Sequence, residues 1–201
     1  MPADALVLAT RNQGKLRELA RILGDQVGLA GLDAFPGAPD VPETGATFEA
    51  NALLKARAIA AYTKLPAVAD DSGLCVDALN GMPGVLSARW AGQHGDDQAN
   101  LDLVLAQVAD VPEDRLGARF VCAAALVVPA DGVAREWVVT GQVEGRLIRA
   151  PKGTGGFGYD PIFQPDGFTE TTAEMTPEAK DAISHRGRAF RALAPFITAF
   201  I

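Results

Sequence analysis

Cysteine and histidine are both scarce in this chain. The only cysteines are Cys75 and Cys122, and neither belongs to a C-x-x-C pair or to a His/Cys cluster with the spacing of zinc ligands. Two such separated cysteines argue against a disulfide framework and favour a reducing compartment. We therefore expect both to be buried, where a cysteine behaves as a small apolar residue.

Long hydrophobic runs are also missing. No apolar stretch approaches the roughly 20 residues that a membrane-spanning helix needs. The first residues, Met1 to Asp4, have neither the charged start nor the apolar stretch of a signal peptide. We expect a soluble, cytoplasmic protein that has no membrane partner.

Positively charged residues are fewer than negatively charged ones. Lysine and arginine number 18 against 25 aspartates and glutamates, so the formal net charge is -7. An acidic chain does not broadly attract nucleic acid or anionic membranes, and we expect no nucleic-acid partner. Any phosphate group that it binds must meet a local cluster of positive groups, which a divalent cation would assist.

The chain does have enough apolar residues for a substantial core. Of its 201 residues, 48% are hydrophobic and 21% are charged, which suits one large domain or two closely joined lobes. Apolar runs of strand length alternate with segments of helical spacing, and this mixture predicts an α/β fold with a mixed sheet. The expected strands are 5–9, 66–69, 120–128 and 136–143, the last two as an antiparallel hairpin. The expected helices are 16–23, 47–62, 97–108, one starting at Thr176-Pro177, and 186–200.

A glycine-containing loop, from Thr10 to Lys15, separates the first expected strand from the first helix. The unpaired N–H groups and positive dipole end of a helix N-terminus suit a phosphate. Gly14 lets the backbone approach closely, and Lys15 supplies a full charge. The side chains of Thr10 and Asn12 can donate hydrogen bonds. The spacing is not that of a Walker A loop, and the alternative is an ordinary strand-to-helix turn that Asn12 caps.

Two neighbouring aspartates, Asp70 and Asp71, follow the expected strand at 66–69. Ligands of α/β sheets usually bind at strand ends. Neighbouring strand residues point to opposite faces, so we expect one carboxylate to face a site and the other to anchor a turn through Ser72 and Gly73. The alternative is an Asx-type turn without chemistry.

The helix expected at 47–62 carries a possible polar face. Asn51 and Lys55 are four residues apart and therefore lie on the same side of the helix. We expect the apolar face to be a different one, which carries Leu54, Ala58, Ala61 and Tyr62. Taken alone, Lys55 is more typical of a solvated lysine than of a ligand-binding one.

A further acidic residue, Glu43, lies in the Pro- and Gly-rich segment that precedes this helix. Mg²⁺ prefers a few carboxylates together with water and phosphate oxygens. Glu43 and Asp71 would meet that need if the fold brings them together.

The segment from Gly153 to Pro161 interleaves glycines with aromatic residues. Such a pattern can place the Phe157 ring flat against a nucleotide base while backbone groups lie close by. Asp160 could contact a base or sugar edge. The alternative is a tight turn between strands, with Phe157 in the core.

A short cluster, Ser184 to Gly187, lies near the start of the last expected helix and follows Lys180. His185 and Arg186 could donate hydrogen bonds to a carbonyl oxygen such as the 6-keto group of a purine. The alternative is a helix cap accompanied by solvated charges.

Six motifs in this order resemble the inosine triphosphate pyrophosphatase family, over about Leu6 to Ala192. Each is weak alone, but six in order are highly specific. They are Thr10-x-Asn-x-Gly-Lys15, Glu43-Thr44-Gly45 with Phe48 to Ala56, Ala69 to Leu74, Gly81-x-Pro-Gly84 with Ser87 to Arg89, Gly155 to Pro161, and Ser184 to Gly187.

The resemblance implies hydrolysis of a nucleoside triphosphate to its monophosphate and pyrophosphate, with inosine, deoxyinosine and xanthosine triphosphates preferred. It also implies one domain over residues 1–201, with an elongated mixed β-sheet and helices that form two lobes around a central nucleotide cleft. A Mg²⁺ cofactor and a homodimer follow from the same resemblance.

Site roles carry over from the resemblance by position. Asp71 is then the proton acceptor and a metal ligand, and Glu43 is a second metal ligand. Arg11 stands where some members have glycine, and it adds charge beside the triphosphate. The implied substrate contacts are Thr10, Arg11, Asn12, Gln13, Gly14, Lys15, Lys55, Ser72, Arg89, Phe157, Gly158, Tyr159, Asp160, Lys180, His185 and Arg186.

Two other functions compete with this one. A related Maf-type pyrophosphatase of other nucleotides should lack the motifs at 155–160 and 184–187, and both are present. A non-catalytic nucleotide-binding module would bind nucleotide without releasing pyrophosphate, and it has little need for Glu43 and Asp71 beside a triphosphate loop.

Overall fold

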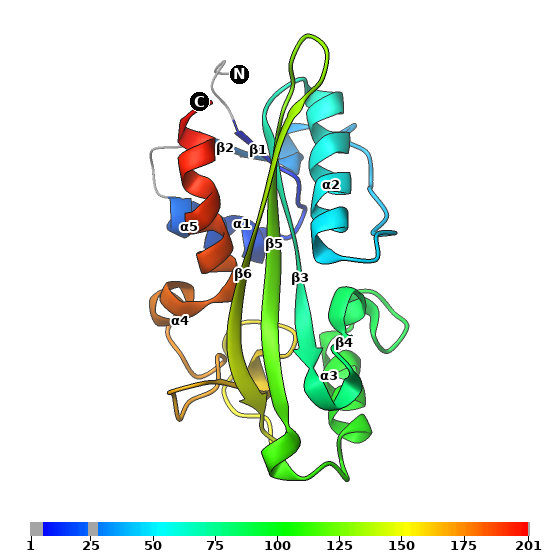
Figure 1. Cartoon of the computed structure of the whole chain (residues 1–201), viewed down its shortest axis with the longest axis vertical. Coiled ribbons are helices and arrows are strands. Elements are labelled where there is room, and N and C mark those ends of the chain that lie inside the picture. Colours follow the sequence, from blue (N-terminus) through cyan, green and yellow to red (C-terminus); the bar gives the residue numbers. More distant parts are fainter. Residues whose placement is uncertain (1–5, 24–27, 201) are drawn as a thin grey trace. The chain divides into compact units, whose positions relative to one another are not determined.

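The computed structural model describes residues 6–23 and 28–200, and in these residues seven strands form one mixed sheet (Figure 1). The strand order is β2-β1-β3-β5-β6-β7, and β4 pairs with β3. The pairs β1–β2 and β1–β3 are parallel, whereas β3–β4 and β6–β7 are antiparallel. The predicted α/β class with a mixed sheet is therefore confirmed. The strands are β1 (Leu6–Leu8), β2 (Leu29–Gly31), β3 (Ala67–Val76), β4 (Met82–Pro83), β5 (Gly117–Val128), β6 (Arg135–Leu147) and β7 (Phe163–Pro165).

Most of the predicted helices and strands are present. The expected hairpin is among them, with β5 and β6 as neighbours in the sheet. Strand β2 was not predicted. The predicted start of the first strand at Ala5 and the predicted helix end at Gly24 lie outside the described residues. The helices are α1 (Gln13–Leu23), α2 (Phe48–Thr63), α3 (Asp97–Gln107), α4 (Pro177–Ile183) and α5 (His185–Thr198).

The chain divides into two compact units, and β3, β5 and β6 each contribute residues to both. The predicted single domain over residues 1–201 stays a prediction. The first unit comprises Met1–Asp71, Cys122–Gly141 and Arg186–Ile201, and the second comprises Ser72–Val121 and Gln142–His185.

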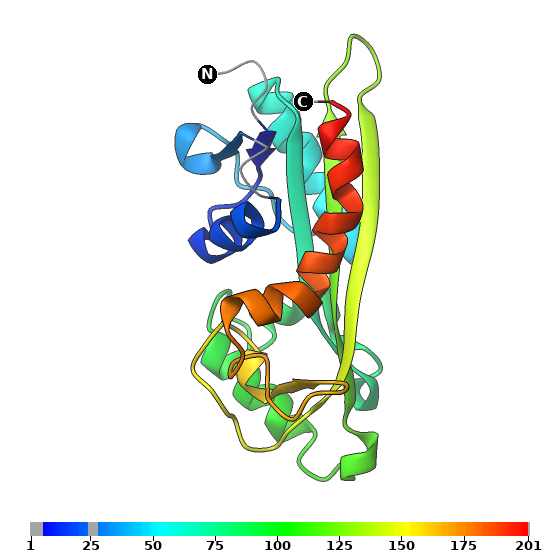
Figure 2. The same ribbon diagram turned by 90° about the vertical axis from the view of Figure 1, so that its left-hand side faces the viewer.

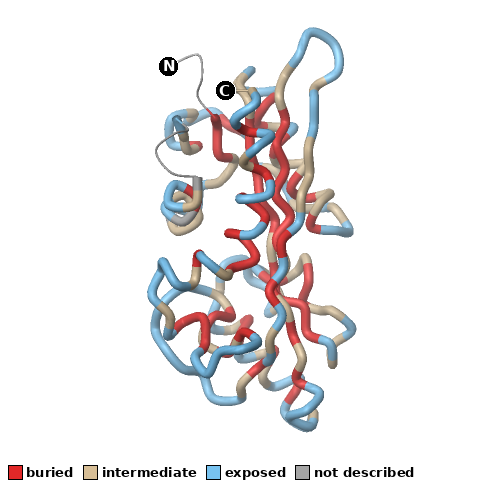
Figure 3. The backbone as a smooth tube through the Cα atoms, turned by 60° about the vertical axis from the view of Figure 1, so that its left-hand side comes forward, coloured by how far each residue is buried: buried red, intermediate tan, exposed pale blue. Residues whose placement is uncertain are grey.

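Helices cover both faces of the strands in the first unit. Helix α5 lies along the strands of the hairpin, and α2 lies beside β3 (Figures 1 and 2). Side chains of α1 and α5, such as Leu19 and Phe190, share one core with β1 and β5. Burial follows the strands, whereas the tip of the hairpin is exposed (Figure 3). The core is Leu6, Leu8, Leu19, Val68, Cys122, Ala124, Leu126, Ala189, Phe190, Leu193 and Ile197.

The second unit has its own core, in which α3 packs against strand residues. Leu101 and Val104 of α3 meet Leu74, Val76 and Phe120 in one buried cluster. Both cysteines of the chain are buried, as predicted. None of the helices in the described part of the chain is both long and apolar enough to cross a membrane.

Strand β3 differs from the sequence-based prediction. It runs over Ala67–Val76, so Asp70 and Asp71 lie inside the strand, and the predicted turn after them is wrong. Gly73 indicates close packing here, not a turn, because a Cβ atom there would lie 2.4 Å from the hydroxyl oxygen of Ser87. The two carboxylates are therefore carried by buried, regular backbone.

Helix α2 begins as predicted, because the hydroxyl oxygen of Thr47 accepts a hydrogen bond from the backbone N–H of Ala50 at 3.2 Å. Its predicted apolar face is wrong. Asn51 is fully buried, whereas Leu54 is only partly buried and Tyr62 is exposed. Alanines occur all round this helix, so the sequence shows no clear apolar stripe. The buried residues are Phe48, Asn51, Ala52, Ala56, Ile59 and Ala60.

Candidate functional site

Helix α1 starts from a loop whose own side chains hold it. Asn12 Oδ1 accepts hydrogen bonds from the backbone N–H groups of Gly14 at 2.8 Å and Lys15 at 3.1 Å. The hydroxyl oxygen of Thr10 accepts one from the Asn12 N–H at 3.1 Å. Asn12 therefore caps the helix, as the alternative interpretation predicted. Arg11 and Lys15 carry the two full positive charges of this loop, and the side chain of Gln13 lies outside the described residues.

A buried ion triad joins this loop to β3 and α5. Lys15 Nζ donates to Asp70 Oδ2 at 2.9 Å, and Arg186 Nε donates to the same oxygen at 3.2 Å. The side chains of Asp70 and Arg186 are each only 2% exposed. Burial favours a higher pKa for Asp70, but the charges of Lys15 and Arg186 outweigh it and hold the pKa well below its ordinary value. Asp70 is therefore an ionised anchor for two predicted substrate contacts.

Asp71 faces the other side of β3, toward α2. Its Oδ2 accepts a hydrogen bond from Asn51 Nδ2 at 2.9 Å, and its Oδ1 lies 3.6 Å from Lys55 Nζ. Lys55 Nζ also donates to Glu43 Oε1 at 2.6 Å. The predicted opposite orientation of the two aspartates is confirmed. The structure also brings Glu43, Lys55 and Asp71 together, and Lys55 is not a solvated lysine.

The charges in this acidic centre (Glu43, Lys55 and Asp71) act on one another. Burial and the negative charge of Glu43 raise the pKa of Asp71 above its ordinary value, although Lys55 and Asn51 favour its ionised form. Burial favours a lower pKa for Lys55, but the surrounding carboxylates outweigh it and raise the pKa. Lys55 therefore stays an ammonium ion between two carboxylates.

The donor set of the acidic centre suits a metal ion that is shared with a ligand. The carboxylates of Glu43 and Asp71 both lie near the Lys55 ammonium group, so both could also reach one small metal ion. No group of three or more His, Cys, Asp or Glu residues that could hold a metal ion occurs among residues 6–23 and 28–200. The carboxylate pair of Glu43 and Asp71 fits Mg²⁺, which commonly takes one or two carboxylates and completes its shell with water and phosphate oxygens.

In the second unit, Asp160 organises the glycine loop. Its Oδ2 accepts hydrogen bonds from the backbone N–H of Phe157 at 2.8 Å and from Lys180 Nζ at 2.6 Å. Its Oδ1 accepts one from the hydroxyl of Thr172 at 2.7 Å. Asp160 is buried, whereas Phe157 is 42% exposed, with Lys180 Nζ over its ring at 5.4 Å from the centroid. Phe157 is therefore not a core residue, and a partly exposed aromatic residue suits stacking on a base.

Neighbouring residues fix the rest of this loop within the second unit. Gly158 donates its backbone N–H to Asp97 Oδ2 at 2.9 Å, and the Tyr159 hydroxyl donates to the Ser87 carbonyl at 2.8 Å. Burial, with the charge of Asp97 nearby, raises the pKa of Tyr159, so it remains a neutral donor. His185 is buried, and its ring stacks on Phe120 at a centroid distance of 4.8 Å.

Three further predicted substrate contacts are Arg11, Ser72 and Arg89. Arg11 donates to the carbonyl of Ala38 at 2.9 Å and lies 3.6 Å from the exposed carboxylate of Asp40. Ser72 lies partly buried in β3, and Arg89 lies partly buried at the end of a short 3₁₀ helix that starts at Gly84. Their contact with substrate stays a prediction.

A family model matches nearly the whole chain. The model of the Ham1 family matches residues 6–196. The chain belongs to the Ham1 family. This confirms the relationship that the motifs indicated.

Curated and solved relatives of this Ham1 family chain cover nearly its whole length. A dITP/XTP pyrophosphatase from Streptomyces coelicolor is 65% identical over 195 residues, 96% of each chain. One from Nocardia farcinica is 61% identical over 203 residues, 99% of this chain and 97% of the relative. A HAM1 protein from Coxiella burnetii superimposes with a TM-score of 0.87 and 40% identity, covering 97% of this chain and 98% of that one. A nucleoside-triphosphatase / dITP/XTP pyrophosphatase from Mycobacterium abscessus does so with a TM-score of 0.78 and 57% identity, covering 95% and 99%.

Sequence reasoning missed three residues of the Ham1 chain's site. Asp70 was noticed as a partner of Asp71, but its contacts with Lys15 and Arg186 depend on the folded chain. Asn51 had a signal, namely its position one helical turn before Lys55. Thr172 had none, because nothing in its neighbourhood marks it as a partner of Asp160.

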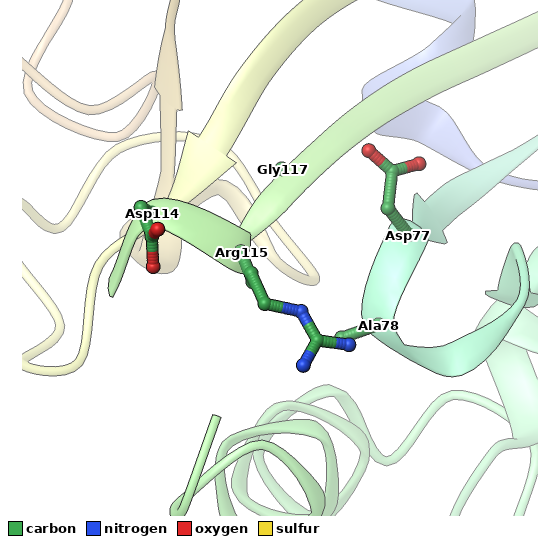
Figure 4. Close-up of a pocket in the computed structure, with 5 residues that line it drawn as sticks. All are labelled: Asp77, Ala78, Asp114, Arg115 and Gly117. Atoms are coloured by element: carbon green, nitrogen blue, oxygen red, sulfur yellow. The ribbon is translucent and has the colours of Figure 1, made fainter. Parts of the chain in front are cut away.

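One surface pocket of about 230 Å³ lies in the second unit, and none of the five residues that line it is a predicted site residue (Figure 4). Asp77, Asp114 and the Arg115 guanidinium are among the groups around it. It therefore contains no group of the phosphate or base motifs.

Proposed function

We propose that this chain hydrolyses the non-standard purine nucleotides ITP, dITP and XTP to their monophosphates and pyrophosphate, and so cleanses the nucleotide pool. The observation that carries the proposal is the meeting of Glu43, Lys55 and Asp71 beside the Lys15–Asp70 pair. Two carboxylates and two ammonium groups are the charges needed to hold a metal-bound triphosphate. The names of the curated relatives, dITP/XTP pyrophosphatases, support the substrate class.

Glu43 and Asp71 would hold Mg²⁺ as the cofactor. When bound, the ion neutralises charge on the phosphate oxygens. Lys15 then adds positive charge for the departing pyrophosphate, and Asp70 holds its ammonium group in place. Lys55 lies between the two carboxylates and offers a third positive group to the phosphates.

Asp71 acts as the general base. As the oxygen of a water molecule forms a bond to the α-phosphorus, one water proton passes to the Asp71 carboxylate. The bond from the α-phosphorus to its bridging oxygen breaks, and pyrophosphate leaves with that bond's electron pair. A raised pKa makes Asp71 a better proton acceptor than an ordinary aspartate.

The purine base is recognised by residues of the glycine loop and of the cluster at 184–187. Phe157 stacks on the purine, and Asp160 keeps the loop around it in shape. His185 and Arg186 donate to the 6-keto group, and they disfavour adenine because its 6-amino group would leave those donors unpaired. The stacking of His185 on Phe120 fixes the plane in which its ring can donate. It stays a prediction that one nucleotide contacts these base-binding residues and the acidic centre at the same time.

The test is pyrophosphate release from ITP, dITP, XTP, ATP and GTP, with and without Mg²⁺. The proposal expects pyrophosphate, one per monophosphate formed, from the first three nucleotides and only with the metal, and little from ATP. GTP measures a separate property, because guanine also has a 6-keto group and the donors of His185 and Arg186 do not exclude it. Equal rates for ATP and ITP would reject the base preference and keep the reaction class. Binding of ITP without any pyrophosphate release would instead establish a non-catalytic nucleotide-binding module.

The homodimer follows from the resemblance alone, whereas the location and the lack of nucleic-acid and membrane partners follow from the composition and charge of the sequence. We propose a homodimer that works in the cytoplasm on free nucleotides, without nucleic-acid or membrane partners. Light scattering on the purified chain would measure a mass of twice 21.0 kDa if the dimer forms. A mass of one chain at micromolar concentration would reject it.

A further inference from the structure

Asn51 is a fully buried polar residue whose two amide ends are both used within the first unit. Its Nδ2 donates to Asp71 Oδ2 at 2.9 Å, and its Oδ1 accepts the backbone N–H of Gly45 at 2.7 Å. Gly45 lies two residues after Glu43. One planar amide therefore connects the strand that carries Asp71 to the loop that carries Glu43.

The orientation of this amide is set by chemistry. A backbone N–H can only donate, so the Asn51 oxygen must face Gly45. An ionised carboxylate can only accept, so the Asn51 nitrogen must face Asp71. Because the amide is rigid, the two contacts fix the separation between the Glu43 loop and the Asp71 carboxylate.

An apolar side chain would suit the buried surroundings of Asn51 better than an amide does. Its neighbours on the buried face of α2 are mostly apolar, and they include Ala52, Ala56 and Ile59. A buried amide is costly unless it is hydrogen-bonded, and asparagine also forms helix less readily than alanine. Packing alone therefore does not explain an asparagine at this position.

We propose that Asn51 is a positioning residue that holds the Glu43 loop against Asp71, so that both carboxylates reach one metal ion. The inference rests on the proposed function for the identity of the two ligands. In this proposal Asn51 sets the spacing of the Glu43 and Asp71 carboxylates and does not contact the substrate.

Two variants break the connection from opposite ends. Asn51→Leu removes both hydrogen bonds while keeping a similar volume. Gly45→Ala displaces the loop, because a Cβ atom there would lie 2.8 Å from Asn51 Oδ1 and 2.8 Å from the Ala50 Cβ atom. Asn100→Ala is the matched control, since Asn100 is also buried and accepts a backbone N–H, from Ala91 at 2.7 Å, in the second unit.

The main readout is binding of Mn²⁺ to the nucleotide-free protein, followed by electron paramagnetic resonance. Both Asn51→Leu and Gly45→Ala should weaken Mn²⁺ binding by roughly ten- to a hundredfold, the usual effect of losing a residue that orients a metal ligand. Asn100→Ala should lower the melting temperature and leave Mn²⁺ affinity unchanged. Thermal unfolding shows whether each variant is folded. If Asn51→Leu does not fold, the Mn²⁺ affinity of Gly45→Ala tests the proposal.

A double-mutant cycle tests the coupling itself. Glu43→Gln should weaken Mn²⁺ binding strongly in the wild-type background and much less in the Asn51→Leu background, because the loop is already displaced there. Equal effects in both backgrounds, unchanged Mn²⁺ affinity in folded Asn51→Leu and Gly45→Ala, or no Mn²⁺ binding by the wild type would overturn the inference. Failure of the proposed function would appear separately, as an absence of pyrophosphate release from every nucleotide.

Discussion

The Lys55 ammonium donates a 2.6 Å hydrogen bond to Glu43, and these side chains are only 13% and 20% exposed. The same ammonium lies 3.6 Å from Asp71. It therefore occupies a position between the two carboxylates that are proposed to bind the metal ion. A metal ion and Lys55 then compete for the same negative charges.

Replacing Lys55 should consequently strengthen metal binding while weakening catalysis. Lys55→Met removes the competing charge, and we expect nucleotide-free Mn²⁺ affinity to rise several-fold. Pyrophosphate release from ITP should fall, because a positive group beside the phosphates is lost. Titration calorimetry with Mn²⁺ and the ITP assay measure the two effects. Lys64→Met is the control, because this exposed lysine follows the same helix and its loss changes net charge equally. Weaker Mn²⁺ binding in Lys55→Met would contradict the competition.

The ion triad around Asp70 should contribute strongly to stability. Asp70→Asn removes the buried charge that Arg186 contacts at 3.2 Å, and breaking a buried pair in this way typically costs about 3–5 kcal/mol. Urea unfolding at neutral pH measures the loss. Asp40→Asn, which removes an exposed carboxylate near Arg11, should leave the free energy of unfolding unchanged.

The same triad predicts a pH dependence. The pKa of Asp70 is lower in the folded than in the unfolded chain, so its stabilising effect is full above the unfolded value of about 4. That effect declines as the pH falls through the lowered folded pKa. The difference in unfolding free energy between wild type and Asp70→Asn should therefore be constant from pH 6 to 8 and shrink below about pH 4. A difference that grows with acidity would show that Asp70 is not a stabilising anion.

Local signals in the sequence were sufficient for much of this fold. Thr47 caps α2 as predicted, and the two-residue period of a strand correctly placed Asp70 and Asp71 on opposite sides of β3. These features depend on a few neighbouring residues. The length of β3 was missed because Ser72-Gly73 is typical of a turn, whereas the glycine is required by close packing against Ser87.

The parts of the site that could not be predicted depend on distant contacts. The apolar face of α2 was placed on the wrong side of the helix, because helical spacing shows which residues share a side but not which side meets β3. Asp160 was expected to contact a base or sugar edge, yet its oxygens accept hydrogen bonds from Thr172 and Lys180, which are 12 and 20 residues away. Partners at such separations leave no local pattern.

Thr172 should therefore affect substrate binding more than turnover. Thr172→Val keeps the shape and removes the hydrogen bond to Asp160, so the loop that carries Phe157 should lose part of its order. One lost hydrogen bond of about 1 kcal/mol corresponds to a KM for ITP that rises roughly fivefold, with kcat nearly unchanged. Steady-state kinetics with ITP measure both. Thr198→Val in α5 is the control, because its hydroxyl bonds only the carbonyls of its own helix in the contacts described. A fall in kcat at constant KM would contradict the assignment.

Asp71 is the residue on which the proposed reaction depends. Asp71→Asn keeps the size of the side chain and an oxygen that can accept from Asn51, so the fold and ITP binding should survive. The lost proton acceptor should slow the chemical step by roughly a hundredfold or more.

The most direct measurement is therefore single-turnover pyrophosphate release from ITP with Mg²⁺, compared between wild type and Asp71→Asn at saturating enzyme. Asp71→Asn also weakens one of the two proposed metal ligands, so both proteins are compared at saturating Mg²⁺. The wild type should form one pyrophosphate per IMP, and the variant should bind ITP yet release pyrophosphate at least about a hundredfold more slowly. An Asp71→Asn protein that binds ITP at saturating Mg²⁺ and turns over at the wild-type rate would contradict the account.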